Sequence, residues 1–343
     1  MENSLSRILI ETTVRQTLKG LQENPKRSTR NLIDMALQFS EGRFQSHFFE
    51  TAQTLLKNED SAYYALVQDT ASHIETEHMV KFGMNLGYNS CTWGAQQIRL
   101  NEKRLGFNIP WALLFRIESF SYAEHQVQYD NAIADGEQLG IYSWILLTHG
   151  DPSPLLPLVQ KHSDSAFFLL CEPESVTEAF LDTASQIKHL MLVVRFCHGA
   201  ERACAMLRGA QLPYAVYCPY SQKDVEGIIN GTLFEKAQQL YPVFTVLVPE
   251  RGCPDSIRHV VYQTVVAVRN GQTYQTIPWE LHYDTRKIDE IISDDACCAF
   301  FDSQGNLYVP DDLHAAAYGN LFADGLPAIL QQAYPKTVPA PTT

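Results

Sequence analysis

The segment Gly140–Pro152, GIYSWILLTHGDP, joins an apolar run to a polar turn and sets the pattern on which the predicted fold rests. Residues 140–148 are mostly aromatic, aliphatic or β-branched, as expected of a strand that is covered on both faces. Similar runs, each followed by a polar and helix-compatible stretch, occupy 109–117, 166–172, 189–196, 212–220 and 241–249. Their starts lie roughly 23 to 31 residues apart. This spacing predicts parallel strands joined by right-handed helical crossovers.

Six such units predict an α/β fold, a partial or complete (β/α) barrel of about six parallel strands, in preference to an open doubly wound sheet. A further β-rich run at 273–283 would extend or close the barrel. The domains expected are an N-terminal helical extension at 1–107, the barrel at 108–285, a small C-terminal α+β region at 286–334 and a disordered tail at 335–343. The C-terminal region should contain a hairpin that turns at Gly305–Asn306.

The charge balance excludes one class of partner. The chain has 343 residues, 39 of them acidic and 26 basic, with a formal net charge of −13. Phosphate backbones need a basic surface, so we expect no nucleic-acid partner. No run approaches the roughly 20 apolar residues of a membrane span, and residues 1–20 lack the apolar core of a signal peptide. We therefore expect a cytoplasmic protein without an integral membrane segment.

Polar residues follow each predicted strand. In a (β/α) barrel the carboxyl ends of the strands meet at one mouth, where binding and chemistry take place. Imidazole and carboxylate groups there could act as acids, bases or metal ligands, although such loop residues often only cap the next helix. No metal-ligand spacing such as H-E-x-x-H supports a metal site. The candidate catalytic residues are His149, Asp151 and His198, and the other candidate ligands at the mouth are Arg116, Glu118, Glu172, Arg195, Tyr220, Arg251, Glu280 and His282.

Several segments, in this order, resemble the radical S-adenosylmethionine (SAM) enzymes, specifically a subgroup with an N-terminal helical extension and a SPASM-like or twitch-like C-terminal region. The resemblance covers about residues 25–330. It rests on NPKRSTRNLIDMALQFSEGRFQSHFFETAQ at 24–53, FGMNLGYNSCTWGAQQIR at 82–99, LPYAVYCPYSQKDVEGIINGTLFEKAQQ at 212–239 and DSQGNLYVPDDLHAAAYGNLFADGLPAIL at 302–330.

The resemblance makes Thr148–Pro152, THGDP, a degenerate form of the family's Gly-Gly-Glu-Pro turn, whose backbone receives the amino group of SAM. Gly150 and Pro152 are kept, whereas Asp151 replaces the glutamate and His149 replaces the first glycine. The aromatic residues Phe115, Tyr142 and Trp144 could stack on an adenine, but the alternation along each strand favours core packing.

The family's cluster-binding loop is missing. Its members carry a C-x-x-x-C-x-x-C motif after the first barrel strand, and three thiolates hold the [4Fe–4S] cluster. Here LLFRIES at 113–119 runs directly into the next predicted helix, and the eight cysteines are scattered as expected of buried, reduced thiols. Pro310 likewise stands where the resemblance implies the terminal hairpin cysteine.

The resemblance thus implies a radical-SAM-like protein that has lost its [4Fe–4S] site, a pseudoenzyme that binds a ligand or a partner. Its partner would be an active radical SAM homologue, a peptide or a small molecule. Two alternatives stay open: an enzyme that uses the barrel mouth for metal-dependent or acid/base chemistry, and a protein that binds SAM or another nucleoside without radical chemistry. We expect no cofactor; SAM is the one ligand of the family for which part of the site remains.

Overall fold

The computed structural model describes residues 4–21, 24–38, 42–293, 295, 297–308 and 318–336. Pro310 and residues 337–343 of the predicted tail lie outside the described residues. Within the described residues no helix is both long enough and apolar enough to cross a membrane.

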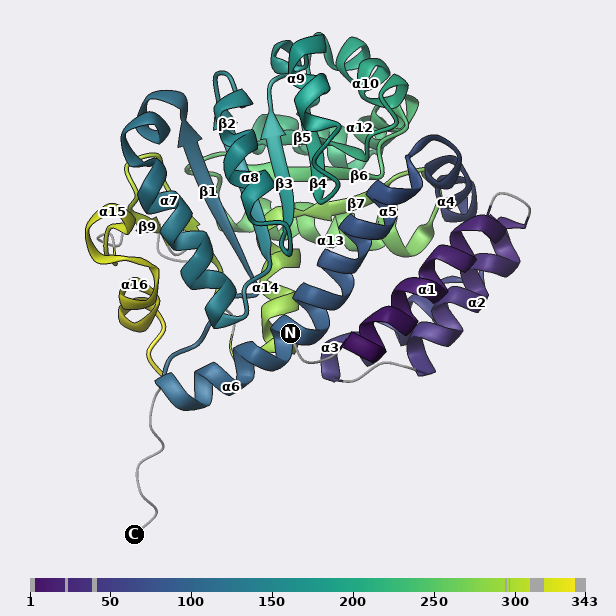
Figure 1. The fold of residues 1–343 in the computed structure, drawn as a ribbon. Helices are drawn as coiled ribbons and strands as arrows, with labels where there is room; N and C mark the ends of the chain where they lie inside the picture. The colour runs from purple at the N-terminus through teal and green to yellow at the C-terminus, as the bar shows by residue number, and fades with distance from the viewer. Residues whose placement is uncertain are drawn as a thin grey trace.

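A curled sheet forms the centre of the molecule, with helices packed around it (Figure 1). Its strand order is β7-β6-β5-β4-β3-β2-β1-β8-β9, and neighbours from β7 to β8 pair in parallel. The prediction of an α/β fold with a partial barrel is confirmed, and the run at 273–283 extends the sheet as an edge strand. The strands are β1 (Ala112–Glu118), β2 (Ser143–His149), β3 (Ala166–Cys171), β4 (Leu190–Arg195), β5 (Tyr214–Tyr220), β6 (Phe244–Pro249) and β7 (Ile277–Glu280), with β8 (Ala299–Phe301) and β9 (Leu307–Tyr308) beyond β1.

The outer face of the sheet is covered by the crossover helices. Alternation along β1 and β2 turns Leu113, Phe115, Trp144 and Leu146 toward these helices, and all of them are fully buried. Phe115 and Trp144 stack with ring centroids 5.8 Å apart, so their predicted role in core packing is confirmed. The crossover helices are α7 (Ser119–Leu139), α8 (Leu156–Lys161), α9 (Glu178–Ala184), α10 (Ala200–Gly209), α11 (Val225–Ile229), α12 (Thr232–Ala237) and α13 (Asp255–Gly271).

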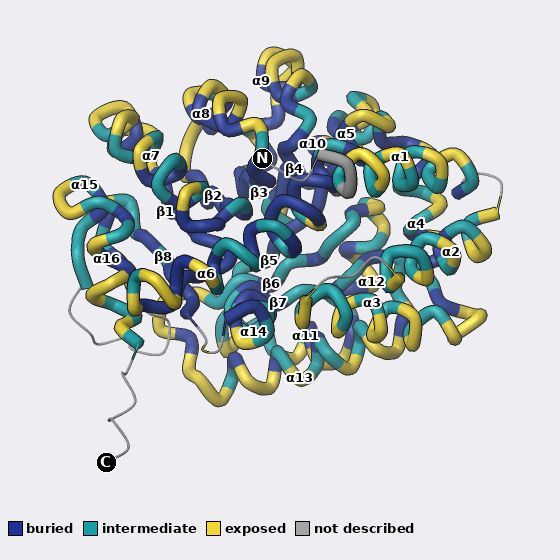
Figure 2. The backbone as a smooth tube through the Cα atoms, turned by 60° about the horizontal axis from the view of Figure 1, so that its bottom comes forward, coloured by how far each residue is buried: buried dark blue, intermediate teal, exposed yellow. Residues whose placement is uncertain are grey.

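The inner face of the curled sheet is apolar below the carboxyl ends of the strands. Leu147, Leu170, Val193 and Ala215 form a buried row there, one residue from each of four adjacent strands. Two residues pack against this inner cluster: Phe82, near the end of α5 (Thr76–Gly83), and Leu281, which begins α14 (Leu281–Ile292). In Figure 2 the central strands β1 to β5 are accordingly mostly dark blue, β6 and β7 are partly teal, and the outer turns of the surrounding helices are exposed.

The N-terminal helices lie on one side of the sheet, with α1 and α2 far from the C-terminal helices in Figure 1. They are α1 (Ser4–Leu21), α2 (Pro25–Gln38), α3 (Arg43–Leu55), α4 (Ala62–His73), α5 (Thr76–Gly83), the π-helix η1 (Met84–Gly94) and α6 (Ala95–Leu105). At the other end, β8 and β9 pair in antiparallel fashion around Gly305, so the predicted hairpin is present. Two short helices, α15 (Leu321–Asp324) and α16 (Leu326–Ala333), follow and pack against α7.

A buried histidine joins α7 to the segment before β3. His162 is 6% exposed, and its Nδ1 and Nε2 lie 3.2 Å and 3.1 Å from carboxylate oxygens of Glu137 and Asp130. Glu137 also accepts a hydrogen bond from Ser165, which in turn accepts one from the indole of Trp144. Burial opposes the charged imidazole, but the two carboxylates outweigh it and raise the pKa of His162 above its usual value.

We predict that His162→Gln lowers the free energy of unfolding by about 2 kcal/mol at pH 6, because two charge-assisted hydrogen bonds are lost. Because the pKa of His162 is higher in the folded protein than in the unfolded chain, its protonation stabilises the fold. This stabilisation is fully present below the unfolded-chain pKa of about 6.5, and it is lost as the pH rises through the pKa of the folded protein. The difference between wild type and variant should therefore shrink from pH 6 to pH 9. Urea unfolding at several pH values measures it, and a difference that grows with pH would contradict the charged state assigned to His162.

Candidate functional site

A row of mostly polar side chains lines the carboxyl end of the inner face. The strand register gives their order. Glu118 pairs with His149 between β1 and β2, and Glu172 lies one residue beyond the Cys171–Val194 pair, beside Arg195. The register continues from Arg195 to Tyr217 in β5, then to Val246 in β6 and Trp279 in β7. We call this set the upper row: Glu118, His149, Glu172, Arg195, Tyr217, Val246 and Trp279.

An ion pair lies at the centre of the upper row. A guanidinium nitrogen of Arg195 donates to a carboxylate oxygen of Glu172 at 3.1 Å, and both side chains are half-buried. Tyr217, the next residue in the row, is 3% exposed, and burial first, then the negative charge of Glu172, raises the pKa of its phenol. The sequence prediction included Glu172 and Arg195 but not Tyr217. No signal in the sequence could have found it, because the near-continuous apolar run of β5 does not show which residues face inward.

The THGDP turn has its polar groups engaged by neighbouring residues. The Thr148 hydroxyl is buried and donates to the carbonyl of Leu170 at 2.9 Å. Gly150 has a φ of +95°, a conformation that favours glycine. The Gly150 and Asp151 carbonyls accept hydrogen bonds from the hydroxyls of Ser175 (3.3 Å) and Ser119 (3.2 Å).

The predicted catalytic residues do not form a connected acid/base group. Asp151 accepts hydrogen bonds from the backbone N–H and the hydroxyl of Ser153, at 2.9 Å and 2.6 Å, as a turn residue does. His149, the last residue of β2, and His198, in the turn that follows β4, are both exposed. Pro152 is buried beneath the same turn. Among the described residues, no hydrogen bond joins His149, Asp151 and His198 to one another.

Strand β1 passes into α7 without an intervening residue, since β1 ends at Glu118 and α7 begins at Ser119. The first part of α7 bends away from the rest at His125, whose φ and ψ are −124° and 27°. The ring of His125 stacks on Phe322 of α15 at 3.8 Å, and the Glu118 carboxylate accepts a hydrogen bond from Ser303 at 3.2 Å. The C-terminal hairpin and α15 therefore lie beside the start of α7.

Three further candidates lie around the inner face. Arg116 is exposed, two residues before Glu118 on the same face of β1. Arg251 follows β6, and its guanidinium lies 6.0 Å from the ring centre of Tyr308 in β9. The half-buried ring of His282 lies 4.5 Å from that of Phe300 in β8. Because β6 and β9 are near opposite ends of the sheet order, the contact of Arg251 with Tyr308 spans the open side of the half-barrel.

The structure places Tyr220 and Glu280 on the outer face, away from the upper row. Both are completely buried, and Tyr220 packs with residues of α13. The Tyr220 hydroxyl donates to Glu280 at 2.8 Å, and Glu280 also accepts from the backbone N–H of Tyr283, capping α14. Burial raises the pKa of Glu280 to about 7. Their placement is a consequence of strand alternation, which turns Tyr220 opposite to Tyr217.

Beside this pair lies Arg258 of α13, which the sequence prediction did not include. It is 6% exposed and donates to Asp255 at 2.9 Å, and its Nη1 lies 3.4 Å from Nδ1 of His282. Burial first, and then the charge of Arg258, lowers the pKa of His282 to about 3, so this imidazole is neutral. The sequence pattern of a helix does not show which of its arginines is buried, so Arg258 could not be distinguished from exposed arginines.

The cysteines do not gather into a ligand set. Among the described residues no group of three or more histidine, cysteine or acidic side chains could hold a metal ion. Cys171 and Cys218 lie near the carboxyl ends of β3 and β5 but belong to the helix-covered core, where burial raises the pKa of each to about 12. Cys197 is exposed after β4.

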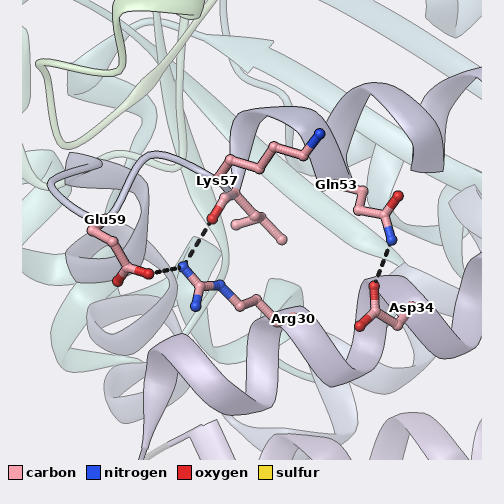
Figure 3. Close-up of a pocket in the computed structure, with 6 residues that line it drawn as sticks. Arg30, Asp34, Gln53, Lys57 and Glu59 are labelled. Atoms are coloured by element: carbon pink, nitrogen blue, oxygen red, sulfur yellow. Dashed lines mark hydrogen bonds and ion pairs between the residues drawn. The ribbon is translucent and has the colours of Figure 1, made fainter.

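The two cavities described in the structure lie away from the upper row. The larger, of about 540 Å³, opens between α2 and α3 and is lined by Arg30, Asp34, Gln53, Leu56, Lys57 and Glu59. Figure 3 shows Arg30 paired with Glu59, at 2.6 Å, and Asp34 accepting a hydrogen bond from the neutral amide of Gln53, at 2.9 Å. The other, of about 340 Å³, lies against α5 and the segment between β3 and β4.

Comparisons with known proteins give structural matches only. No family model matches the chain, and no curated protein matches it. Among solved structures, it is similar to Streptococcus suis SuiB bound to S-adenosylmethionine, with a TM-score of 0.48, 9% identity and coverage of 67% of this chain. It spans 66% of that SuiB chain, just under two thirds. SuiB bound to the precursor peptide SuiA matches with a TM-score of 0.47, 9% identity and coverage of 68% of this chain and 67% of that one. A third match, the histidine-tagged anSMEcpe with bound AdoMet, has a TM-score of 0.40 and 12% identity, and covers 64% of this chain and 77% of that one.

Proposed function

We propose that this chain is a radical-SAM-like half-barrel without the [4Fe–4S] cluster, and that it binds a ligand or a partner at its inner face. The observation that carries the proposal is the junction of β1 and α7. A cluster-binding loop would have to lie between these elements, and Glu118 is followed directly by the first residue of α7. The residues present do not fit a cluster, since Cys171 and Cys218 lie in the helix-covered core and only Cys197 is exposed.

The THGDP turn supports the same proposal. An amino group that approached the turn would share the carbonyls of Gly150 and Asp151 with the hydroxyls of Ser175 and Ser119, which already donate to them. Each carbonyl oxygen has a second lone pair, so the hydroxyls would weaken SAM binding by competition. The upper row could bind a ligand, because its charged residues stand beside half-buried apolar side chains, among them Phe168, Val246 and Phe300. An active homologue, a peptide or a small molecule remain the proposed partners, and a cytoplasmic location remains a prediction.

Anaerobic reconstitution with iron and sulfide tests the proposal. We predict a colourless protein with far less than one cluster per chain and without the broad absorption near roughly 400 nm that iron–sulfur clusters give. Cys197→Ser is the control, because it removes the exposed thiol to which iron could attach nonspecifically. Close to four iron atoms per chain, unchanged in Cys197→Ser, would refute the proposal.

A thermal-shift measurement on the same protein tests the remaining alternative, that the chain binds SAM without radical chemistry. A ligand that binds only the folded state raises the melting temperature. We expect no change with SAM for the wild type. The variant Ser119→Ala/Ser175→Ala frees the two carbonyls, so a shift that appears only in this variant would show that the hydroxyls block the turn. A shift in the wild type would instead favour a SAM-binding protein without radical chemistry.

A further inference from the structure

Glu280 is a completely buried carboxyl group whose hydrogen bonds, among the described residues, come from neutral donors. Its Oε1 accepts the Tyr220 hydroxyl at 2.8 Å, and its Oε2 accepts the backbone N–H of Tyr283 at 2.6 Å. Its register partner in β6 is the apolar Leu247. A carboxylate is costly to bury unless a cation contacts it, so burial here favours the neutral carboxyl group.

The charged groups around Glu280 are engaged with other residues. On α13, Arg258 favours ionisation of Glu280, but it already donates to Asp255 at 2.9 Å. On α14, the Asp284 carboxylate accepts two hydrogen bonds from Arg269 and opposes ionisation of Glu280. Burial is the largest effect and raises the pKa of Glu280 to about 7. The remaining titratable neighbours are uncharged at neutral pH, since burial raises the pKa values of Cys253, Tyr220, Tyr262 and Tyr283 and lowers that of His282.

The position of Glu280 connects the two faces of the sheet. It is the last residue of β7 and the N-cap of α14, and Tyr220 is the last residue of β5. The next two residues reach the inner face. Leu281 packs in the inner cluster, and the ring of His282 lies 4.5 Å from that of Phe300. A change of charge at Glu280 therefore acts on the first turn of α14 and on the packing of the inner face.

We propose that Glu280 is a pH switch, which holds the first turn of α14 against β5 and β7 while its carboxyl group is neutral and releases that turn when the group ionises. Release lets water solvate the carboxylate, whereas the closed state keeps it buried. This inference goes beyond the proposed binding role, because it assigns a control of the inner face by pH.

The direction of the pH dependence follows from the two states. The pKa of Glu280 is about 7 in the closed state, against a usual value of about 4.5 for a solvated glutamate. The closed state is therefore most stable below about pH 4.5, and it loses stability as the pH rises to about 7. Above that pH both states are ionised, and the equilibrium between them becomes constant.

Hydrogen exchange of the Tyr283 amide tests the switch, because this N–H donates to Glu280 in the closed state. The measured rate divided by the rate of an unstructured peptide at the same pH gives the opening constant. In the wild type this constant should rise about 10- to 100-fold from pH 5 to pH 8. In Glu280→Gln, which keeps the size of the side chain but cannot ionise, it should change by less than about threefold. Glu178→Gln removes an exposed carboxyl group from the first turn of α9 and should keep the wild-type response.

Two results of this experiment would overturn the inference. An equal rise in the wild type and in Glu280→Gln would mean that another group opens α14, and a wild-type opening constant that is independent of pH would exclude a switch. If Glu280→Gln does not fold, NMR titration of ¹³C-labelled glutamate carboxyls in the wild type takes its place. One carboxyl should titrate near pH 7, and the absence of any titration above about pH 6 would equally refute the switch.

Discussion

Replacing Gly94 with alanine should destabilise the protein by about 3 kcal/mol or more, the upper range for forcing extra volume into a packed interior. Gly94 ends the π-helix η1, where its backbone passes against Gly140. A Cβ built at Gly94 would lie 2.4 Å from the Gly140 carbonyl oxygen and 2.7 Å from that of Asn89. Both contacts are with backbone atoms, so no side chain can move aside to relieve them. Either the π-helix or the turn before β2 would have to shift.

Urea unfolding of Gly94→Ala and Gly87→Ala separates this close contact from helix propensity. Gly87 lies in the same π-helix, and a Cβ there would meet nothing within 4 Å. Gly87→Ala should therefore be neutral or stabilising by up to about 1 kcal/mol. If the two variants unfolded at the same urea concentration, the packing of η1 against Gly140 would not be as described.

The strands could be predicted from the sequence, whereas the direction of their side chains could not. Near-continuous apolar runs such as 140–148 mark a strand covered on both faces. Such a run lacks the alternation that would reveal which residues face the inside. Tyr220 ends β5 and was therefore expected at the mouth, yet the residue on the inner face is Tyr217. A shift of one residue along the strand exchanges the side chains of the inner and outer faces. Only the strand pairing in the structure shows which residues face inward.

The π-helix shows a second limit of sequence-based prediction. Residues 84–94, MNLGYNSCTWG, are rich in glycine, asparagine, serine and threonine, which are weak helix formers. Nothing in this composition predicts a π-helix, in which each N–H bonds to the carbonyl five residues earlier. In the structure the Asn85 side chain donates to the carbonyls of Ser163 and Ser165, and Asn89 donates to that of Asp164. These partners lie some 75 to 80 residues away, in the segment before β3. Long-range contacts of this kind hold the wider helix, and single-sequence patterns do not contain them.

The candidate site was predictable to the same extent. The rule that polar residues follow strands placed Glu172 and Arg195 at the carboxyl ends of β3 and β4, and in the structure these two form an ion pair. It could not reveal that Ser119 at the start of α7 and Ser175 after β3 donate to the carbonyls of the THGDP turn. Each of these contacts joins residues 32 or 25 positions apart, so only the fold shows them.

Removal of the Arg269 guanidinium should also have a large effect, a loss of about 2–4 kcal/mol from the free energy of unfolding. Its two terminal nitrogens donate to the Asp284 carboxylate at 3.0 Å and 2.7 Å, and Asp284 is 4% exposed. Asp284 also accepts the backbone N–H of Glu280 at 2.8 Å, so the pair joins α13, β7 and α14. Breaking such a pair leaves a buried charge without its partner, which costs up to about 5 kcal/mol. The Arg269 side chain is 22% exposed, and water that reaches the site should reduce the cost.

A double-mutant cycle measures this coupling directly. Arg269→Met keeps much of the side-chain volume, and Asp284→Leu removes the charge that Arg269→Met leaves unpaired. The double variant should be more stable than the sum of the two single losses implies, by about 1–3 kcal/mol. Lys287→Met is the matched control, because Lys287 forms only an exposed pair with Glu290 on the same helix and should change stability by less than about 0.5 kcal/mol. Strictly additive losses would mean that Arg269 stabilises the fold through its contacts with Pro278 and Trp279 instead of through Asp284.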